Sequence, residues 1–99
     1  MKIGIVGLGQ VGIYLYNELN LKKKDIEKKT GKKIKLVAIS AKNKNKKRRF
    51  KINKKIFFSN PFKIFKEKKI DILFECIGYS DGISKKIVEF ALKNKINVI

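Results

Sequence analysis

The glycines near the amino terminus constrain the fold of this chain more than any other feature. They form a G-x-G-x-x-G pattern, whose members in order are Gly7, Leu8, Gly9, Gln10, Val11 and Gly12. An apolar run from Ile3 to Val6 comes directly before them and predicts a buried strand. After them, Val11, Leu15 and Leu19 recur every fourth residue, which predicts the inner face of a helix. The glycines therefore lie where a strand turns into a helix.

A strand-to-helix turn with this glycine spacing is typical of a dinucleotide-binding site. We expect Gly7 to permit the tight turn, Gly9 to let the backbone approach a pyrophosphate, and Gly12 to let helix and strand pack closely. The free N–H groups and the positive dipole end of the helix would then face the phosphates. The alternative is a glycine-rich turn without a ligand. The strand and the helix on either side favour the dinucleotide.

Composition limits the chain to one globular domain and argues against a nucleic-acid partner. Its 99 residues are 43% hydrophobic, which is normal for a folded protein. The net charge of +18 suggests a nucleic-acid binder, but all except two of the 26 basic residues are lysine. Recognition of bases and phosphates favours arginine, and the abundance of Lys, Ile and Asn is typical of an AT-rich genome. We therefore assign most lysines to solvated helix faces, although their field would still attract an anionic nucleotide.

The single cysteine, Cys76, fits a protein of the reducing cytoplasm. The chain has no histidine to activate this thiol, so we interpret Cys76 as a small buried hydrophobe, and we predict neither a catalytic residue nor a metal site. Glu75 precedes it in an apolar run, where we favour a structural role over a place in the site. Glycines interrupt the apolar amino terminus, and no apolar run is long enough to cross a membrane. We therefore expect no signal peptide and no membrane partner.

Strand and helix patterns alternate along the whole chain. The expected strands cover residues 2–7, 33–40, 56–58 and 71–77, with a last one beginning at 97, and the expected helices cover 10–29, about 61–69 and 84–94. This alternation predicts an α/β fold with a parallel sheet covered on both faces. The expected class is a Rossmann-type doubly wound sheet of about five strands and three helices, in the order 3-2-1-4-5. Because residues 1–99 stop within an apolar strand, we expect a truncated domain.

Local signals mark the ends and faces of these helices. Gly31 suits the end of the first helix, and Asn60 followed by Pro61 suits the start of the second. Phe62 and Phe65 would then face the sheet as core aromatics. The apolar stripe expected on the last helix consists of Ile87, Val88, Ala91 and Leu92.

The end of the second strand bears on the type of cofactor. In this fold ligands bind at the carboxyl ends of the strands, and NAD sites usually have an acid there for the ribose 2′-hydroxyl. Residues 39–44 contain no acid, whereas Ser40 can donate a hydrogen bond and Lys42 can supply a charge. The sequence therefore favours NADP or tolerates both NADP and NAD. The alternative is that Lys42 is one more solvated lysine.

Four segments together resemble the N-terminal coenzyme domain of homoserine dehydrogenase. They are residues 1–12, 30–40, 71–78 and 91–99, so the resemblance spans essentially the whole chain. That family interconverts aspartate 4-semialdehyde and homoserine with NAD(P), on the route to threonine and methionine. Two residues depart from its usual pattern: Gln10 stands where the family usually has Thr, and Tyr79 where a second Gly is common.

The resemblance also implies positions for cofactor-binding residues. Leu8, Gln10 and Val11 would line the pyrophosphate turn, and Lys42 would take the place of the basic residue that meets the 2′-phosphate. The remaining contacts, beside the adenosine or nicotinamide end, would come from Cys76, Ile77 and Gly78. The family carries its catalytic residues, its small-molecule substrate and its oligomer contacts in a further domain, so we expect none of them here. A non-enzymatic nucleotide-sensing module and another NAD(P)-dependent amino-acid dehydrogenase are the alternatives.

Overall fold

The computed structural model describes residues 1–77 and 82–99, which form a five-stranded sheet in the order β3-β2-β1-β4-β5. Every neighbouring pair of strands is parallel. The strands are β1 (Lys2–Val6), β2 (Lys35–Ser40), β3 (Phe57–Phe58), β4 (Ile72–Glu75) and β5 (Asn97–Val98). The predicted class, strand order and edge position of the third strand are thus confirmed.

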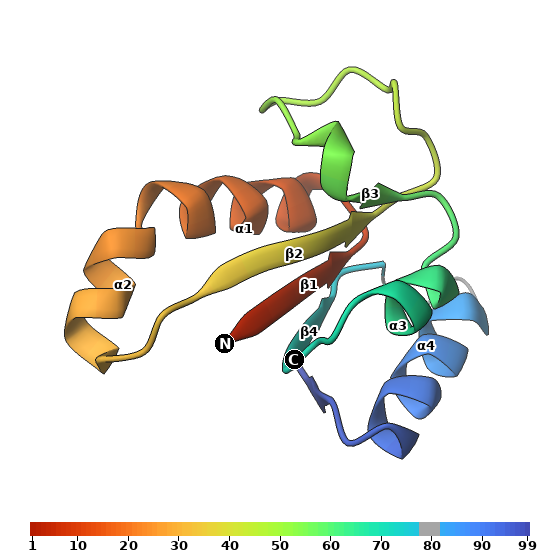
Figure 1. Ribbon diagram of the computed structural model, residues 1–99. Helices are drawn as coiled ribbons and strands as arrows, with labels where there is room; N and C mark the ends of the chain where they lie inside the picture. Colours follow the sequence, from red (N-terminus) through yellow and green to blue (C-terminus); the bar gives the residue numbers. More distant parts are fainter. Residues whose placement is uncertain (78–81) are drawn as a thin grey trace.

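Helices cover both faces of this sheet (Figure 1). They are α1 (Gln10–Leu21), α2 (Lys23–Thr30), α3 (Phe62–Glu67) and α4 (Gly82–Lys93), with a short 3-10 helix, η1 (Lys54–Ile56), before β3. On one face, Ile13 and Tyr16 of α1 pack with Ile5 and Ile39 of the central strands. On the other face, α3 and α4 form a second core with the sheet, whose fully buried members are Val6, Ala38, Ile64, Leu73, Ile87 and Ala91.

The single long helix predicted over residues 10–29 is wrong, because the chain forms two helices that meet at Lys22. The apolar pattern ends at Leu21, and α2 buries none of its residues. Without an apolar face, nothing holds the second helix along the sheet, so the chain turns away (Figure 1). The predicted end is confirmed: Gly31 closes α2 with a φ of 71°, and its N–H bonds to the carbonyl of Glu27.

The predicted inner face of α1 is also only partly right. The helix buries Gly12, Ile13 and Tyr16, whereas Leu15 is half-buried and Val11 is 72% exposed. Gly12 approaches the preceding turn closely, which rotates its own side of the helix toward the sheet. The predicted stripe of the last helix needs a similar correction. Leu92 of α4 is 59% exposed, because the line of Ser84, Ile87 and Ala91 faces the sheet instead.

Hydrogen bonds and ring contacts confirm three other expectations. The side-chain oxygen of Asn60 accepts the N–H of Phe62 at 3.0 Å, so Asn60 bonds to the start of α3 as expected, although the cap position is Pro61 and the helix begins one residue later than predicted, at Phe62. Phe62 and Phe65 are partly buried and pack against the core that α3 and α4 form with the sheet. They also contact Phe90 of α4, with ring centres 6.2 and 5.0 Å apart. Glu75 has the structural role favoured above, because its carboxylate accepts the N–H of Ile77 at 2.6 Å where β4 ends.

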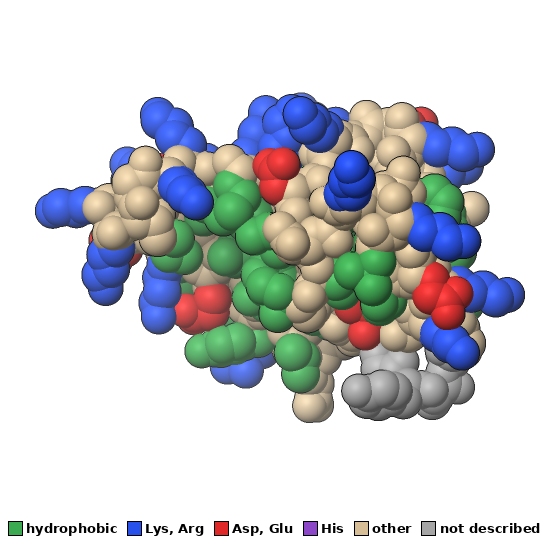
Figure 2. Space-filling view, turned by 90° about the horizontal axis from the view of Figure 1, so that it is seen from below, with side chains coloured by type: hydrophobic (Ala, Val, Ile, Leu, Met, Phe, Trp, Pro, Cys, Tyr) green, Lys and Arg blue, Asp and Glu red, His purple; other side chains and the backbone are tan. Residues whose placement is uncertain are grey.

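The basic side chains are spread widely over the surface. Figure 2 shows lysines and arginines around the edge of one face, with hydrophobic side chains gathered nearer its centre. The lysines of α2 are exposed, as expected of a solvated helix. No helix within residues 1–77 and 82–99 combines the length and the apolar character that a bilayer crossing needs.

Candidate dinucleotide-binding site

The glycine turn lies at the carboxyl ends of three adjacent strands. The sheet register places Val6 beside Ser40 on one side and beside Glu75 on the other. Gly7 follows with a φ of 95°, and its N–H donates to the carbonyl of Ser40 at 2.7 Å. The N–H of Cys76 donates to the carbonyl of Val6 at 2.8 Å. The structure thus brings together the ends of β1, β2 and β4, where the predicted cofactor-binding residues lie.

The three glycines of the pattern differ in what surrounds them. A Cβ at Gly7 would lie 2.7 Å from the backbone of Cys76, and one at Gly12 would lie 1.8 Å from the carbonyl oxygen of Gly7. These two glycines are therefore required by the packing of the protein itself. A Cβ at Gly9 would meet no atom within 4 Å. The missing side chain of Gly9 thus leaves open space outside the turn.

This open space lies at the start of α1, where the helix has no side-chain cap and no acidic residue in its first turn. The N–H of Ile13 bonds back to the carbonyl of Gly9. The N–H groups before Ile13 have no partner within the helix. Together with the helix dipole, they favour an anion at this point.

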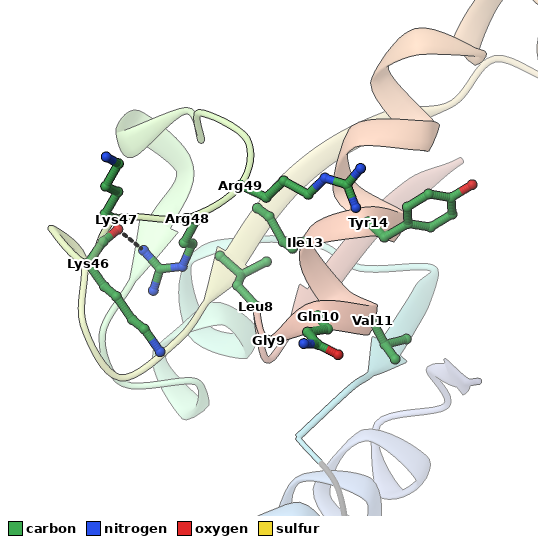
Figure 3. A pocket seen from close by; sticks show the side chains of 10 residues that line it. All are labelled: Leu8, Gly9, Gln10, Val11, Ile13, Tyr14, Lys46, Lys47, Arg48 and Arg49. Atoms are coloured by element: carbon green, nitrogen blue, oxygen red, sulfur yellow. Dashed lines mark hydrogen bonds between the residues drawn. The ribbon is translucent and has the colours of Figure 1, made fainter.

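Two cavities flank the turn. The first, of about 680 Å³, lies between α1 and the segment 46–49, and we call it the helix-side cavity (Figure 3). It is lined by Leu8, Gly9, Gln10, Val11, Ile13, Tyr14, Lys46, Lys47, Arg48 and Arg49. The second, of about 480 Å³, lies over the ends of the strands, and we call it the strand-end cavity. Gly9, Leu8, Lys46 and Arg48 line both cavities, and neither contains an acidic residue among the described residues that line it.

The predicted site residues distribute between these cavities. Four residues of the turn line the helix-side cavity: Leu8, Gly9, Gln10 and Val11. The strand-end cavity is lined by Gly7, Ser40, Lys42, Cys76 and Ile77, among others. Ser40 is only 1% exposed, whereas Lys42 is exposed. Gly12 lines neither cavity, because it is buried against Gly7. Gly78 and Tyr79 lie outside the described residues.

Sequence reasoning missed the basic segment 46–49, which forms one wall of the helix-side cavity. It belongs to the long connection between β2 and β3, residues 41–56, a lysine-rich stretch in which the sequence predicted no site residue beyond Lys42. Tyr16 of α1 holds the far end of this connection, because its hydroxyl accepts the N–H of Asn53 at 2.8 Å. One signal was available: the only two arginines of the chain, Arg48 and Arg49, stand side by side here.

Cys76 lines the strand-end cavity but is not prepared for nucleophilic chemistry. Its side chain is half-buried, and burial raises the pKa of the thiol, with a smaller contribution from the Glu75 carboxylate. The neutral thiol is therefore favoured. Among the described residues, no group of acidic, histidine or cysteine side chains could hold a metal ion.

These features fit a dinucleotide phosphate. Open space at Gly9, N–H groups at the start of α1 that have no partner within the helix, and cavity walls whose described residues include cations and no acids all favour a negatively charged ligand. The apolar residues Leu8, Ile13 and Ile77 supply surface for the less polar parts of such a ligand.

Comparisons with known proteins agree with this geometry. The crystal structure of S. aureus homoserine dehydrogenase at pH 7.0 matches with a TM-score of 0.87 and 26% sequence identity, over 99% of this chain and 25% of that one. Its structure at pH 7.5 gives a TM-score of 0.88 at the same identity and coverage. This chain thus spans about a quarter of the length of that enzyme. A search of curated protein sequences found no match.

A comparison with protein families gives a match over residues 1–99 to the family described as "Oxidoreductase family, NAD-binding Rossmann fold". The match covers the turn, the five strands and the basic connection alike. The family description agrees with the cofactor class predicted from the glycine spacing. The chain belongs to this oxidoreductase family with an NAD-binding Rossmann fold, and its cofactor class is NAD(P).

Proposed function

We propose that this chain is the coenzyme-binding part of a homoserine dehydrogenase, which interconverts L-homoserine and L-aspartate 4-semialdehyde. The observation that carries this proposal is the match to S. aureus homoserine dehydrogenase, which extends over 99% of the chain at 26% identity. Because the match covers only 25% of that enzyme, we assign the catalytic residues, the substrate site and the oligomer contacts to the rest of the enzyme. The corresponding roles in threonine and methionine biosynthesis, and a cytoplasmic location, are part of the same proposal.

The glycine turn would hold the pyrophosphate. Gly9 leaves room for the phosphates, and the first N–H groups of α1, which have no partner within the helix, would donate to their oxygens. The hydrogen bond from Gly7 to Ser40 fixes the turn to β2, so these donors are oriented before the ligand arrives. The hydride chemistry itself belongs to the cofactor when it is bound.

The strand-end cavity would receive the adenosine side or the nicotinamide side of the cofactor. Cys76 and Ile77 line this cavity and would supply an apolar wall there. A contact from Gly78, which lies outside the described residues, is part of the same proposal. Ser40 and Lys42 would meet the ribose and its 2′-substituent. A carboxylate at the end of β2 would repel a 2′-phosphate, and none lines this cavity among the described residues. We therefore propose a preference for NADP, or the use of both cofactors.

Calorimetric titration of NADPH and NADH into the protein tests the cofactor site. We expect both to bind, NADPH more tightly. The enzyme assay uses the full protein that carries this chain and follows NADP⁺ reduction with L-homoserine, with L-malate as a matched control substrate. Binding of neither cofactor would overturn the site. Cofactor binding without homoserine-dependent reduction would instead favour another dehydrogenase or a nucleotide-sensing module.

A further inference from the structure

Arg48 closes the short segment 43–48 on itself. Its two terminal nitrogens donate to backbone carbonyls of the same segment, Nη1 to Lys46 at 3.2 Å and Nη2 to Asn43. The side-chain oxygen of Asn43 accepts the N–H of Asn45 at 3.1 Å. The carbonyl of Asn43 also receives the N–H of Lys46 at 3.4 Å. Arg48 therefore bonds to both sides of the turn in this segment.

The guanidinium of Arg48 is turned toward its own loop and away from the glycine turn (Figure 3). Its Nε atom is buried and has no hydrogen-bond partner within the described part of the chain. A ligand in either cavity therefore cannot reach Nε without moving the side chain. Arginine is the usual partner of phosphate because of its planar fork of donors. Here the ends of that fork bind main-chain carbonyls.

Lys46 differs from Arg48 in exposure. Both residues line the two cavities, but Lys46 is exposed whereas Arg48 is partly buried, so the Lys46 side chain is the one that reaches the space at their shared wall. Within residues 1–77 and 82–99, its ammonium group makes no hydrogen bond or ion pair. Its main-chain position depends on Arg48, because the carbonyl of Lys46 is one of the two groups that the guanidinium binds.

The segment is also attached to its surroundings. Lys54 of η1 donates to the side-chain oxygen of Asn45 at 3.0 Å, and the bond between Asn53 and Tyr16 ties the same connection to α1. The position of segment 43–48 is therefore coupled to the helix that carries the glycine turn.

We propose that Arg48 is a positioning residue that holds Lys46 at the shared wall, where the Lys46 ammonium contacts a phosphate of the bound cofactor. Arg48 acts through the loop, because its terminal nitrogens are held by main-chain carbonyls and its Nε is buried. The proposal rests on NAD(P) being the ligand of this site. It separates two cations, two residues apart, that the sequence alone would treat as equivalent.

The test uses three variants: Arg48→Ala, Lys46→Ala and the double variant that carries both changes. The control is Lys47→Ala, which removes the same charge as Lys46→Ala at a residue that lines only the helix-side cavity. The first measurement is hydrogen–deuterium exchange of segment 43–49 without cofactor. We expect R48A to accelerate exchange about tenfold, the equivalent of one charged hydrogen bond, and K46A to leave it unchanged. Arg48→Lys keeps the positive charge but loses the two-pronged guanidinium that bonds to both carbonyls, so its exchange should be accelerated as in R48A. This variant provides the same test if R48A does not fold.

The second measurement is the Kd for NADPH and NADH by calorimetry. We expect R48A and K46A each to weaken binding about tenfold, and the double variant to be no weaker than K46A. A loss for NADPH alone identifies the 2′-phosphate as the partner of Lys46, and a loss for both cofactors identifies the pyrophosphate. Both patterns support the proposal.

Three results would overturn the inference while leaving the cofactor site intact. They are unchanged exchange in R48A, losses in R48A and K46A that multiply in the double variant, and a loss in K47A equal to that in K46A. If the unmodified protein bound neither cofactor, the cofactor assignment and the role of Lys46 would fail together. The exchange measurement would still decide whether Arg48 closes the loop.

Discussion

Substituting alanine at Gly9 and at Gly12 should separate cofactor binding from folding within one turn. The two glycines are three residues apart in the same pattern, yet their surroundings are opposite. A Cβ at Gly12 would lie 1.8 Å from the carbonyl oxygen of Gly7 and 2.8 Å from its carbon, whereas a Cβ at Gly9 meets nothing within 4 Å. The first position is closed by the protein, and the second is open to a ligand.

The expected loss of stability in Gly12→Ala is large because the clash is with backbone. A clash with a side chain could be relieved by rotation, but this one requires α1 to move away from β1. Overpacking of this kind costs about 1–3 kcal/mol, and we take about 3 kcal/mol because no side chain can yield. In a domain of this size each 1 kcal/mol lowers Tm by about 4–8 °C. Thermal unfolding should therefore show a fall in Tm of about 12–24 °C.

Gly9→Ala should fold nearly normally and bind the cofactor poorly. Alanine is a weaker residue than glycine at a helix start, which costs about 1 kcal/mol or less and so at most about 8 °C in Tm. The new methyl group projects into the space proposed for the phosphates, and we expect NADPH affinity to fall at least about tenfold, or about 1.4 kcal/mol. Gly82→Ala is the matched control for stability, because its Cβ would also meet nothing within 4 Å.

Two results would refute this reasoning. A G9A variant that binds NADPH as well as the unmodified protein would show that the phosphates lie elsewhere. A G12A variant with a Tm within about 2 °C of the unmodified protein would show that α1 does not need the close approach to β1.

Three further predictions follow from contacts around the site. Lys42→Ala should weaken NADPH binding more than NADH binding, and the loss of NADPH affinity should be smaller at high salt because the charge is exposed. The control is Lys66→Ala on α3, a residue that lines neither cavity. Equal losses of affinity in both variants would refute a local role for Lys42. Tyr16→Phe removes the hydrogen bond from the N–H of Asn53. Because Asn53 is exposed and water can replace the lost partner, the change should cost about 0.5–1.5 kcal/mol in urea unfolding. It should also speed exchange in residues 46–53, and unchanged exchange would contradict the anchoring role. Because burial raises the pKa of the Cys76 thiol, the unfolded chain loses this proton first as pH rises. The free energy of unfolding should therefore fall between about pH 7 and pH 9.5 by more in the unmodified protein than in Cys76→Ser. Equal pH slopes in the two proteins would contradict the raised pKa.

Local signals in the sequence were sufficient for most elements and for the glycine turn. Gly31 ends α2 and Asn60 bonds to the first residue of α3 as expected, because each of these effects involves hydrogen bonds between residues close in sequence. The alternation of strands and helices led to the correct strand order, since parallel strands joined by helices allow few arrangements. The glycine spacing alone likewise indicated that Gly7 permits the tight turn, where it has a positive φ.

Packing between distant segments decided what the sequence could not. The break of the first helix at Lys22 and the exposure of Val11 depend on where the sheet ends and how closely α1 approaches it. Helical periodicity predicts that a stripe exists, but contact with the sheet decides which stripe is buried.

The basic connection between β2 and β3 shows most clearly which properties the sequence determines and which depend on the tertiary structure. By itself, the sequence determined a run of cations and, separately, a turn that favours phosphate, because charge and glycine spacing are properties of neighbouring residues. Only the tertiary structure decided that Arg48 binds its own loop while Lys46 stands at the wall of both cavities. That outcome depends in part on the bond between Tyr16 and Asn53, which lie 37 residues apart. Contacts over such separations form only when the chain is folded, so no local pattern could reveal them.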